Sequence, residues 1–223
     1  MLSRTRPKML LVRHPQVDTA YRGVCYGQSD VPLGPAGREA CERIAEEVSQ
    51  LPIAHVIHTG LQRTRLLAEA IERRTGVQPM REVVLRERDF GAWELRTWDE
   101  IYHDHGEEMT KMITDPHHFR PGGGETTDAL AARVVQWSQQ WAKPGIAVVV
   151  THGGPIAALL GRQRSLPVDD WPSLIPACGE QVRYDPQNAG PWMNLASDAP
   201  FVSAAQETAD AANDCPPARR SRV

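Results

Sequence analysis

Residues 146–150, with the sequence IAVVV, constrain the fold more than any other segment because all five side chains are apolar. A strand with one face in water alternates apolar and polar residues, whereas a continuous apolar run indicates burial on both faces. Helices cover both faces of a sheet when helical crossovers join its parallel strands. We therefore expect this segment to be a central strand of a mainly parallel sheet.

Shorter apolar runs and helical patterns alternate along the rest of the chain. Further strands are predicted at residues 9–12, 55–58 and 83–85. Helices are predicted where apolar residues recur three or four positions apart, at residues 36–51, 61–74, 127–141 and 155–160. Thr127 is the expected N-terminal cap of the third helix. The alternation predicts an α/β fold with layers of helices on a mainly parallel sheet.

One domain is expected at residues 9–194, because no linker divides this stretch and no internal repeat occurs in it. Residues 1–8 carry three basic side chains and form a basic N-terminal extension. The apolar stretch that follows them is four residues long, too short for a secretory signal. Residues 195–223 are rich in Ala, Ser, Asp and Pro, so this tail is predicted to be disordered.

The composition excludes several classes of protein. The chain has 25 Lys and Arg against 28 Asp and Glu, a formal net charge of -3, which argues against a dedicated nucleic-acid binder. No apolar run approaches the roughly 18 residues of a membrane span. The four cysteines form no CxxC pair, so neither a zinc knuckle nor a thioredoxin-like motif is indicated. A reduced, cytoplasmic location is the simplest expectation.

Polar residues that can hold an anion follow three of the predicted strands. Arg13 and His14 follow the first strand, His152 and Gly153 follow the strand at 146–150, and Arg63 follows the strand at 55–58. Sites in α/β sheets form at the carboxyl ends of strands, where helix N-termini also offer free N–H groups. Because a guanidinium binds tetrahedral oxyanions with two parallel hydrogen bonds, we expect a phosphate site there.

Six segments carry a resemblance to a known family. They are LVRH at 11–14, YGQSDVPL at 26–33 with Gly37, TGLQR at 59–63, LRERDFGAWE at 85–94, PGGGET at 121–126 and VVTHGG at 149–154. Together and in this order they resemble the signature of the histidine phosphatase (phosphoglycerate mutase-like) superfamily. The segments at 26–33 and 121–125 are similar to α-ribazole phosphatase-like members of its phosphatase branch. The resemblance implies a three-layer α/β/α sandwich with a mainly parallel central sheet.

The resemblance also implies a mechanism that needs neither a metal nor an organic cofactor. His14 would be the nucleophile and form a phosphohistidine, with its other ring nitrogen held by a hydrogen bond, the expected partner being a backbone carbonyl. Glu87 would protonate the leaving oxygen and then activate water, although Glu94 and Glu125 are nearby acids that could serve instead.

The remaining residues of the implied site bind or surround the phosphoryl group. His152 is expected to be catalytic as well as phosphate-binding. The full phosphate-binding set is Arg13, Arg63, His152 and Gly153. Residues expected behind the site or against the substrate are Gln16, Tyr26 and Gln28.

The sequence departs from the family pattern at several positions. Pro15 replaces the glycine of the RHG signature and removes an N–H. Ala20 stands where relatives often carry Asn, Thr64 begins the segment that reads AxQTA in relatives, and Leu95 replaces a glycine. These changes affect the expected rate and substrate preference more than the class of reaction.

The expected function is hydrolysis of a phosphomonoester on a small phosphorylated metabolite, with α-ribazole 5′-phosphate or a sugar phosphate as candidates. One alternative is phosphoglycerate mutase-type transfer. It is disfavoured because cofactor-dependent mutases of this superfamily carry a longer insertion between the positions of Glu87 and His152. The other alternative is a catalytically weakened phosphate-binding regulatory protein, which Pro15 motivates. Neither nucleic acid nor membrane is an expected partner, and a homodimer stays open.

The histidines at 103, 105, 117 and 118 allow three interpretations. They could bind a metal or lie in a solvated loop, which their polar surroundings favour. In the family that the chain resembles, this region forms an insertion over the site, so His103, His105 or His118 could instead contact substrate.

Overall fold

Residues 8–186 are described by the computed structural model, and five of their strands form one sheet in the order β4-β3-β6-β1-β7. The strands are β1 (Lys8–Arg13), β3 (Ile53–His58), β4 (Pro79–Arg81), β6 (Ile146–Thr151) and β7 (Gln181–Tyr184). Only β7 is antiparallel to its neighbour. All six residues of β6 are buried at the centre of the sheet, which confirms the prediction from its apolar run.

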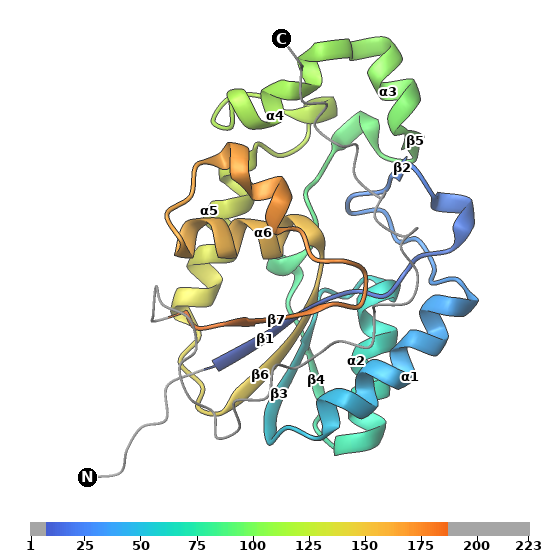
Figure 1. The fold of residues 1–223 in the computed structure, drawn as a ribbon, viewed down its shortest axis with the longest axis vertical. Coiled ribbons are helices and arrows are strands. Elements are labelled where there is room, and N and C mark those ends of the chain that lie inside the picture. The colour runs from blue at the N-terminus through green and yellow to red at the C-terminus, as the bar shows by residue number, and fades with distance from the viewer. Residues whose placement is uncertain (1–7, 187–223) are drawn as a thin grey trace.

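Two pairs of helices cover the two faces of the sheet (Figure 1). One pair is α1 (Pro35–Ser49) and α2 (Gln62–Thr75), and the other is α5 (Thr127–Gln140) and α6 (Gly153–Gln163). Alternate residues of β6 divide between two cores, with Val149 facing α5 and α6 and Val150 facing α1 and α2. The predicted three-layer α/β/α sandwich is therefore confirmed. Within residues 8–186, no helix is long and apolar enough to cross a membrane.

Local sequence signals set the helix ends. Pro35 occupies the first turn of α1, and α2 ends at Gly76, whose φ of 73° lies in the left-handed region. The cap of α5 is Thr126 rather than the predicted Thr127, because the Thr126 side chain accepts a hydrogen bond from the N–H of Ala129.

The strand predicted at 83–85 is wrong. Those residues form a single 3-10 turn, while the strand paired with β3 is β4, from Pro79 to Arg81. Proline is tolerated as the first residue of an edge strand, where its missing N–H breaks no ladder. The apolar run instead reflects the burial of Leu85, whose carbonyl accepts a 2.7 Å hydrogen bond from Thr151 Oγ1.

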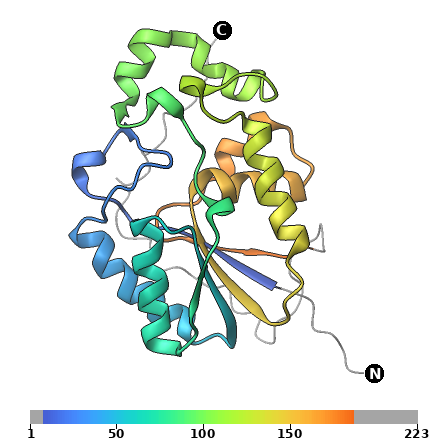
Figure 2. The same ribbon diagram turned by 180° about the vertical axis from the view of Figure 1, so that it is seen from behind.

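A small layer lies beyond the carboxyl ends of the strands, and its helices and strands were not predicted from the sequence (Figures 1 and 2). It contains β2 (Val24–Cys25), β5 (Arg96–Thr97), α3 (Trp98–His105) and α4 (Lys111–Thr114). Its own core consists of Cys25, Trp93, Ile101 and Met109. Short 3-10 turns complete the fold at Thr19–Tyr21, Val83–Leu85, Gly91–Trp93, Gly106–Thr110, Pro121–Gly123 and Val168–Leu174.

The expected domain limits are tested only in part by these residues. Lys8, assigned to the N-terminal extension, is the first residue of β1. The predicted disordered tail at 195–223 lies outside the described residues.

Candidate active site

His14 follows β1 directly and is 2% exposed. Its Nδ1 lies 2.8 Å from the carbonyl oxygen of Pro15. A carbonyl oxygen only accepts hydrogen bonds, so Nδ1 carries the proton and, in a neutral ring, Nε2 holds a bare lone pair. Pro15 thus supplies the backbone carbonyl that the sequence predicted as the partner of this ring.

The surroundings of His14 keep the ring neutral. Burial is the main cause that lowers its pKa well below 6.5, and the positive charges of Arg63 and Arg13 lower it further. The hydrogen bond to Pro15 acts in the opposite direction but is the smallest cause. A neutral imidazole with a bare Nε2 is a nucleophile rather than an acid at neutral pH.

His152 is brought to His14 by the parallel register of the sheet. Arg13 pairs with Thr151 across β1 and β6, so the residues that follow each strand lie side by side. The two imidazole rings have centroids 5.2 Å apart, and His152 is fully buried. Burial, followed by the charge of Arg63, lowers the pKa of His152 well below 6.5.

Arg63, in the first turn of α2, is fully buried at 0% exposure. Its guanidinium donates to the carbonyls of Ser29 at 2.7 Å and Gly27 at 2.6 Å, and lies over the ring of Tyr26. Nε donates to Nδ1 of His152 at 3.4 Å. Burial lowers the pKa of Arg63, yet a guanidinium stays protonated in proteins.

Within the described part of the chain Arg63 forms no salt bridge with a carboxylate, and Glu87, Asp30 and Glu94 stabilise its charge only without direct contact. Buried charges in proteins are normally paired. An unpaired, buried guanidinium beside two neutral histidines is therefore suited to an anion.

Arg13 and Gly153 complete the predicted anion-binding set. Nη1 of Arg13 donates to the carbonyl of Pro176 at 2.8 Å, which fixes the side chain against the segment before β7. Gly153 begins α6 and faces Arg13, since a Cβ built on it would lie 3.6 Å from Arg13 Nε. The N-terminus of α6 adds its N–H groups and the positive end of its dipole.

Glu87 lies at the same end of α6, where its Oε2 accepts a 3.1 Å hydrogen bond from the N–H of Gly154. A methyl group on Gly154 would overlap Oε1 of Glu87. The second glycine of the THGG segment therefore makes room for this carboxylate.

The two alternative acids are occupied elsewhere. Glu94 accepts hydrogen bonds from the backbone N–H groups of Gln28, Ser29 and Phe90, and from the Ser29 hydroxyl at 2.5 Å. It holds together the loop that binds Arg63, and its carboxylate oxygens are used for that purpose. Glu87 is thus the acid whose side chain the fold places beside the N-terminus of α6.

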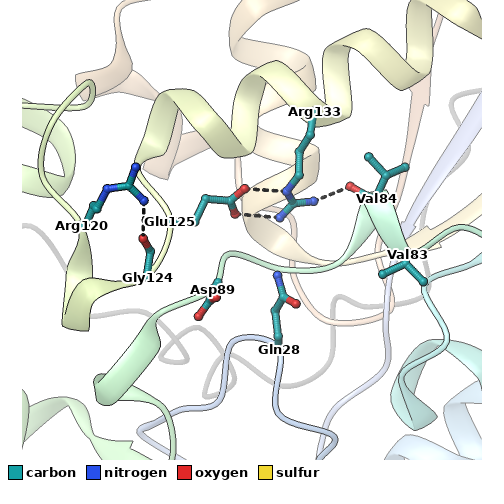
Figure 3. Close-up of a pocket in the computed structure, with 8 residues that line it drawn as sticks. All are labelled: Gln28, Val83, Val84, Asp89, Arg120, Gly124, Glu125 and Arg133. Carbon is teal, nitrogen blue, oxygen red and sulfur yellow. Dashed lines mark hydrogen bonds and ion pairs between the residues drawn. The ribbon is translucent and has the colours of Figure 1, made fainter.

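Glu125 forms a partly buried ion pair instead. Its two oxygens accept from Nε and Nη2 of Arg133 at 2.7 and 2.9 Å, and the same guanidinium donates to the carbonyl of Val84 (Figure 3). The guanidinium also donates to the carbonyl of Glu87, at 3.0 Å. Gln28 Nε2 also donates to the Glu87 carbonyl, at 3.1 Å. Arg133 and Gln28 therefore fix the backbone that presents Glu87.

A cavity of about 410 Å³ lies beside the ion pair of Glu125 and Arg133 (Figure 3). It is lined by Gln28, Val83, Val84, Asp89, Arg120, Gly124, Glu125 and Arg133. His14, His152 and Arg63 do not line it, so it is distinct from the space around the two histidines.

The other predicted residues divide between the site and the surface. Tyr26 lies at the site, with its ring centroid 6.3 Å from that of His14. The side chain of Gln16 is exposed. Its backbone carbonyl packs closely against Gly37, where an added methyl group would overlap the carbonyl oxygen. Ala20 lies exposed in the turn at Thr19–Tyr21.

The histidine cluster separates into unrelated contacts. His105 Nε2 accepts from Trp93 Nε1 at 3.1 Å, His118 pairs with Asp115, and His117 pairs with Asp128. Across residues 8–186 no group of three potential ligands could hold a metal ion. The metal interpretation of these histidines is therefore wrong for the described residues.

Sequence reasoning missed several residues that support the site. Thr59 and Thr64 are buried behind His152, Ser29 joins Arg63 to Glu94, and Arg133 fixes the Glu87 backbone. Thr59 and Ser29 were within the family motifs, but nothing in a one-dimensional pattern indicates which partner a hydroxyl finds.

Comparisons with known proteins identify the family of the chain. Residues 9–198 match the histidine phosphatase superfamily (branch 1). The probable phosphoglycerate mutase GpmB of Photorhabdus laumondii is 30% identical over 193 residues, covering 83% of this chain and 87% of that protein. A mycobacterial glucosyl-3-phosphoglycerate phosphatase solved with VO3 gives a TM-score of 0.71 at 27% identity, covering 79% of this chain and 91% of that one.

The α-ribazole phosphatase from Shigella flexneri has a TM-score of 0.68, covering 79% of this chain and 89% of that one. At 20% identity this likeness shows the shared fold. The match at residues 9–198 spans most of the chain and includes every predicted site residue. The chain belongs to the histidine phosphatase superfamily.

Proposed function

We propose that the protein is a phosphomonoester hydrolase that acts through a phosphohistidine on a small phosphorylated metabolite. The observation that carries the proposal is the neutral, Nδ1-protonated His14 beside the buried, carboxylate-free guanidinium of Arg63. A bare nucleophilic nitrogen and a buried guanidinium without a salt bridge suit phosphoryl transfer to an imidazole.

In the first step, Nε2 of His14 attacks phosphorus and the phosphorus–oxygen bond to the leaving group breaks. Glu87 donates a proton to the departing oxygen, which leaves as an alcohol. The positive charge that develops on the imidazole is stabilised because its Nδ1–H already donates to the Pro15 carbonyl. Arg13, Arg63 and His152 bind the phosphoryl oxygens, with Gly153 at the end of α6.

In the second step, the Glu87 carboxylate takes a proton from water, and the water oxygen bonds to phosphorus as the phosphorus–nitrogen bond breaks. His14 recovers its lone pair, Glu87 is again protonated, and inorganic phosphate is released. Protons and electron pairs balance with side chains of this chain alone. We therefore propose that turnover is metal-independent and persists in the presence of a chelator. We also propose that the enzyme acts in the cytoplasm, in line with its scattered cysteines.

The substrate candidates are α-ribazole 5′-phosphate and sugar phosphates, including phosphorylated glycerate derivatives such as the one in the name of the mycobacterial relative. A panel of these compounds, assayed for phosphate release, ranks them by kcat/KM. The mutase alternative is supported by the relative named as a probable phosphoglycerate mutase. It predicts 2-phosphoglycerate from 3-phosphoglycerate and 2,3-bisphosphoglycerate faster than phosphate release, and that result would overturn the hydrolase assignment.

The direct test is hydrolysis of an aryl phosphate by the wild-type chain and by His14→Ala, at acidic to neutral pH with chelator present. We expect turnover only in the wild type, together with an alkali-stable phosphoenzyme after rapid quenching. His118→Ala is the matched control, because that histidine is exposed and bonded to Asp115. Phosphate binding without turnover in the wild type would support the regulatory alternative instead.

A further inference from the structure

Two arginines meet at the turn that follows β3. Arg81 is the last residue of β4 and pairs with His58, the last residue of β3. The chain then passes through the 3-10 turn at Val83–Leu85 and returns, so that Arg86 Nε donates to the carbonyl of Thr59 at 3.3 Å. Two side chains from different segments therefore reach the residues that link β3 to α2.

Gly60 makes room for the side chain of Arg81. Its φ of 89° lies in the left-handed region that favours glycine, and a Cβ built on it would be 2.5 Å from Arg81 Nε and 3.2 Å from Cζ. The guanidinium thus lies against the Gly60 backbone, next to the Thr59 carbonyl that Arg86 contacts. The glycine of the TGLQR segment brings the two guanidinium groups to one turn.

Neither guanidinium is paired with a carboxylate. Within residues 8–186, the Arg81 side chain forms no ion pair or hydrogen bond, and the bond to Thr59 is the only one that the Arg86 side chain forms. The neighbouring imidazole of His58 adds no negative charge, since its Nδ1 accepts from the Gly60 N–H at 3.1 Å. Both arginines therefore have free N–H groups to offer an anion.

Thr59 joins this turn to the candidate active site. Its hydroxyl lies 3.0 Å from His152 Nε2, while its carbonyl accepts from Arg86. Because β4, β3 and β6 are parallel, Arg81 and His152 lie at the same edge of the sheet. The basic side chains of this edge thus extend from the candidate phosphate site outward to β4.

We propose that Arg81 and Arg86 form a second anion-binding site, which takes a carboxylate or phosphate group carried by the part of the substrate that leaves with the alcohol. A guanidinium is suited to either group because its planar fork matches two oxygens. This inference rests on the proposed function and narrows its substrate class. It favours phosphorylated acids over α-ribazole 5′-phosphate, whose remaining part is an uncharged nucleoside. A free anion has the same chemistry, so the experiment separates the two sources.

The first arm of the experiment measures phosphate release from 3-phosphoglycerate and from glycerol 3-phosphate at constant ionic strength. The two esters have the same carbon chain and differ by a carboxylate or a hydroxymethyl group at its end. We expect the wild type to prefer 3-phosphoglycerate by about tenfold in kcat/KM, the factor of one hydrogen bond between charged groups.

The double variant Arg81→Gln/Arg86→Gln should lose this preference, so that the ratio of the two kcat/KM values falls to about one. The matched control is Arg43→Gln, which removes a positive charge from an exposed position in the middle of α1 and should keep the wild-type ratio.

The second arm does not depend on turnover. Titration calorimetry measures the binding of 3-phosphoglycerate and of inorganic phosphate in the His14→Ala background, in which the proposed phosphoryl transfer cannot occur. We expect the double variant to bind 3-phosphoglycerate about tenfold more weakly and inorganic phosphate with little change. Loss of a second bound phosphate, with the substrate ratio unchanged, would support the site with a free anion as its occupant.

An unchanged substrate ratio together with unchanged binding of both ligands would overturn the inference even if hydrolysis is confirmed. Weaker binding of 3-phosphoglycerate by the double variant would support the site even if the wild type turns over neither ester, a result that would count against the proposed function alone.

Discussion

The substitution Gly154→Ala, at the start of α6, should reduce activity strongly and change stability little. The added methyl group would overlap Oε1 of Glu87, the end of a flexible side chain, and would lie 3.3 Å from Leu130 Cδ2. The least costly response is rotation of the Glu87 carboxylate away from the N–H of Gly154. The backbone of α6 and the two histidines need not move.

The effect on stability should be small because two contributions oppose each other. Alanine is favoured over glycine in a helix by about 0.8–1 kcal/mol. The lost hydrogen bond between Gly154 and Glu87 costs about 0.5–1.5 kcal/mol. We expect the free energy of unfolding in urea to change by less than about 1 kcal/mol.

The effect on activity should be large and should depend on the leaving group. A positioned general acid contributes roughly 10²–10⁴-fold, and an alkyl phosphate depends on it more than an aryl phosphate whose leaving group needs no proton. Gly154→Ala should therefore reduce hydrolysis of an alkyl phosphate far more than that of 4-nitrophenyl phosphate. Glu87→Gln, which keeps the shape without a transferable proton, should show the same selectivity.

Equal losses for the two substrates would refute the reasoning, since they would point to damage at the phosphate-binding groups rather than at the acid. An unchanged rate for both substrates in Glu87→Gln would remove Glu87 from the proton-transfer role altogether.

Three further predictions concern stability and phosphate binding. Burial lowers the pKa of His14 and His152 below 6.5, so below pH 6.5 the unfolded chain binds protons that the folded chain does not. The free energy of unfolding in urea should therefore decrease as the pH is lowered below 6.5, by about 1.4 kcal/mol per pH unit for each histidine. Glu94→Ala leaves several N–H groups without their acceptor and should lower the free energy of unfolding by about 1–3 kcal/mol, whereas exposed Glu39→Ala should not. Arg63→Lys should weaken inorganic phosphate binding in calorimetry, because an ammonium cannot reproduce the fork held by Gly27 and Ser29.

Much of the anion site was predictable because it depends on periodicity and strand order. The apolar run at 146–150 predicts a buried central strand, and the segments that end the parallel strands carry His14, Arg63 and His152. Parallel strands place their carboxyl ends at one edge, so residues distant in sequence converge there. The family motifs then indicated which of these side chains act together.

The supporting contacts were not predictable in the same way. Glu87, Glu94 and Glu125 are equivalent candidates in sequence, and they differ only in what surrounds each carboxylate: a helix N-terminus, a loop of N–H groups, or a guanidinium. The edge strand β4 and the exposed side chain of Gln16 were likewise decided by packing.

The sequence alone determined the layered α/β architecture and the family, and it predicted the residue types at the proposed phosphate site, because these follow from local periodicity and from motifs fixed in order. Only the tertiary structure decided which glutamate stands at α6, that the Pro15 carbonyl lies at His14 Nδ1, and that a buried threonine hydroxyl lies at His152 Nε2. The physical reason is that a hydrogen bond depends on the distance and direction between two groups that folding brings together, and a sequence pattern specifies neither.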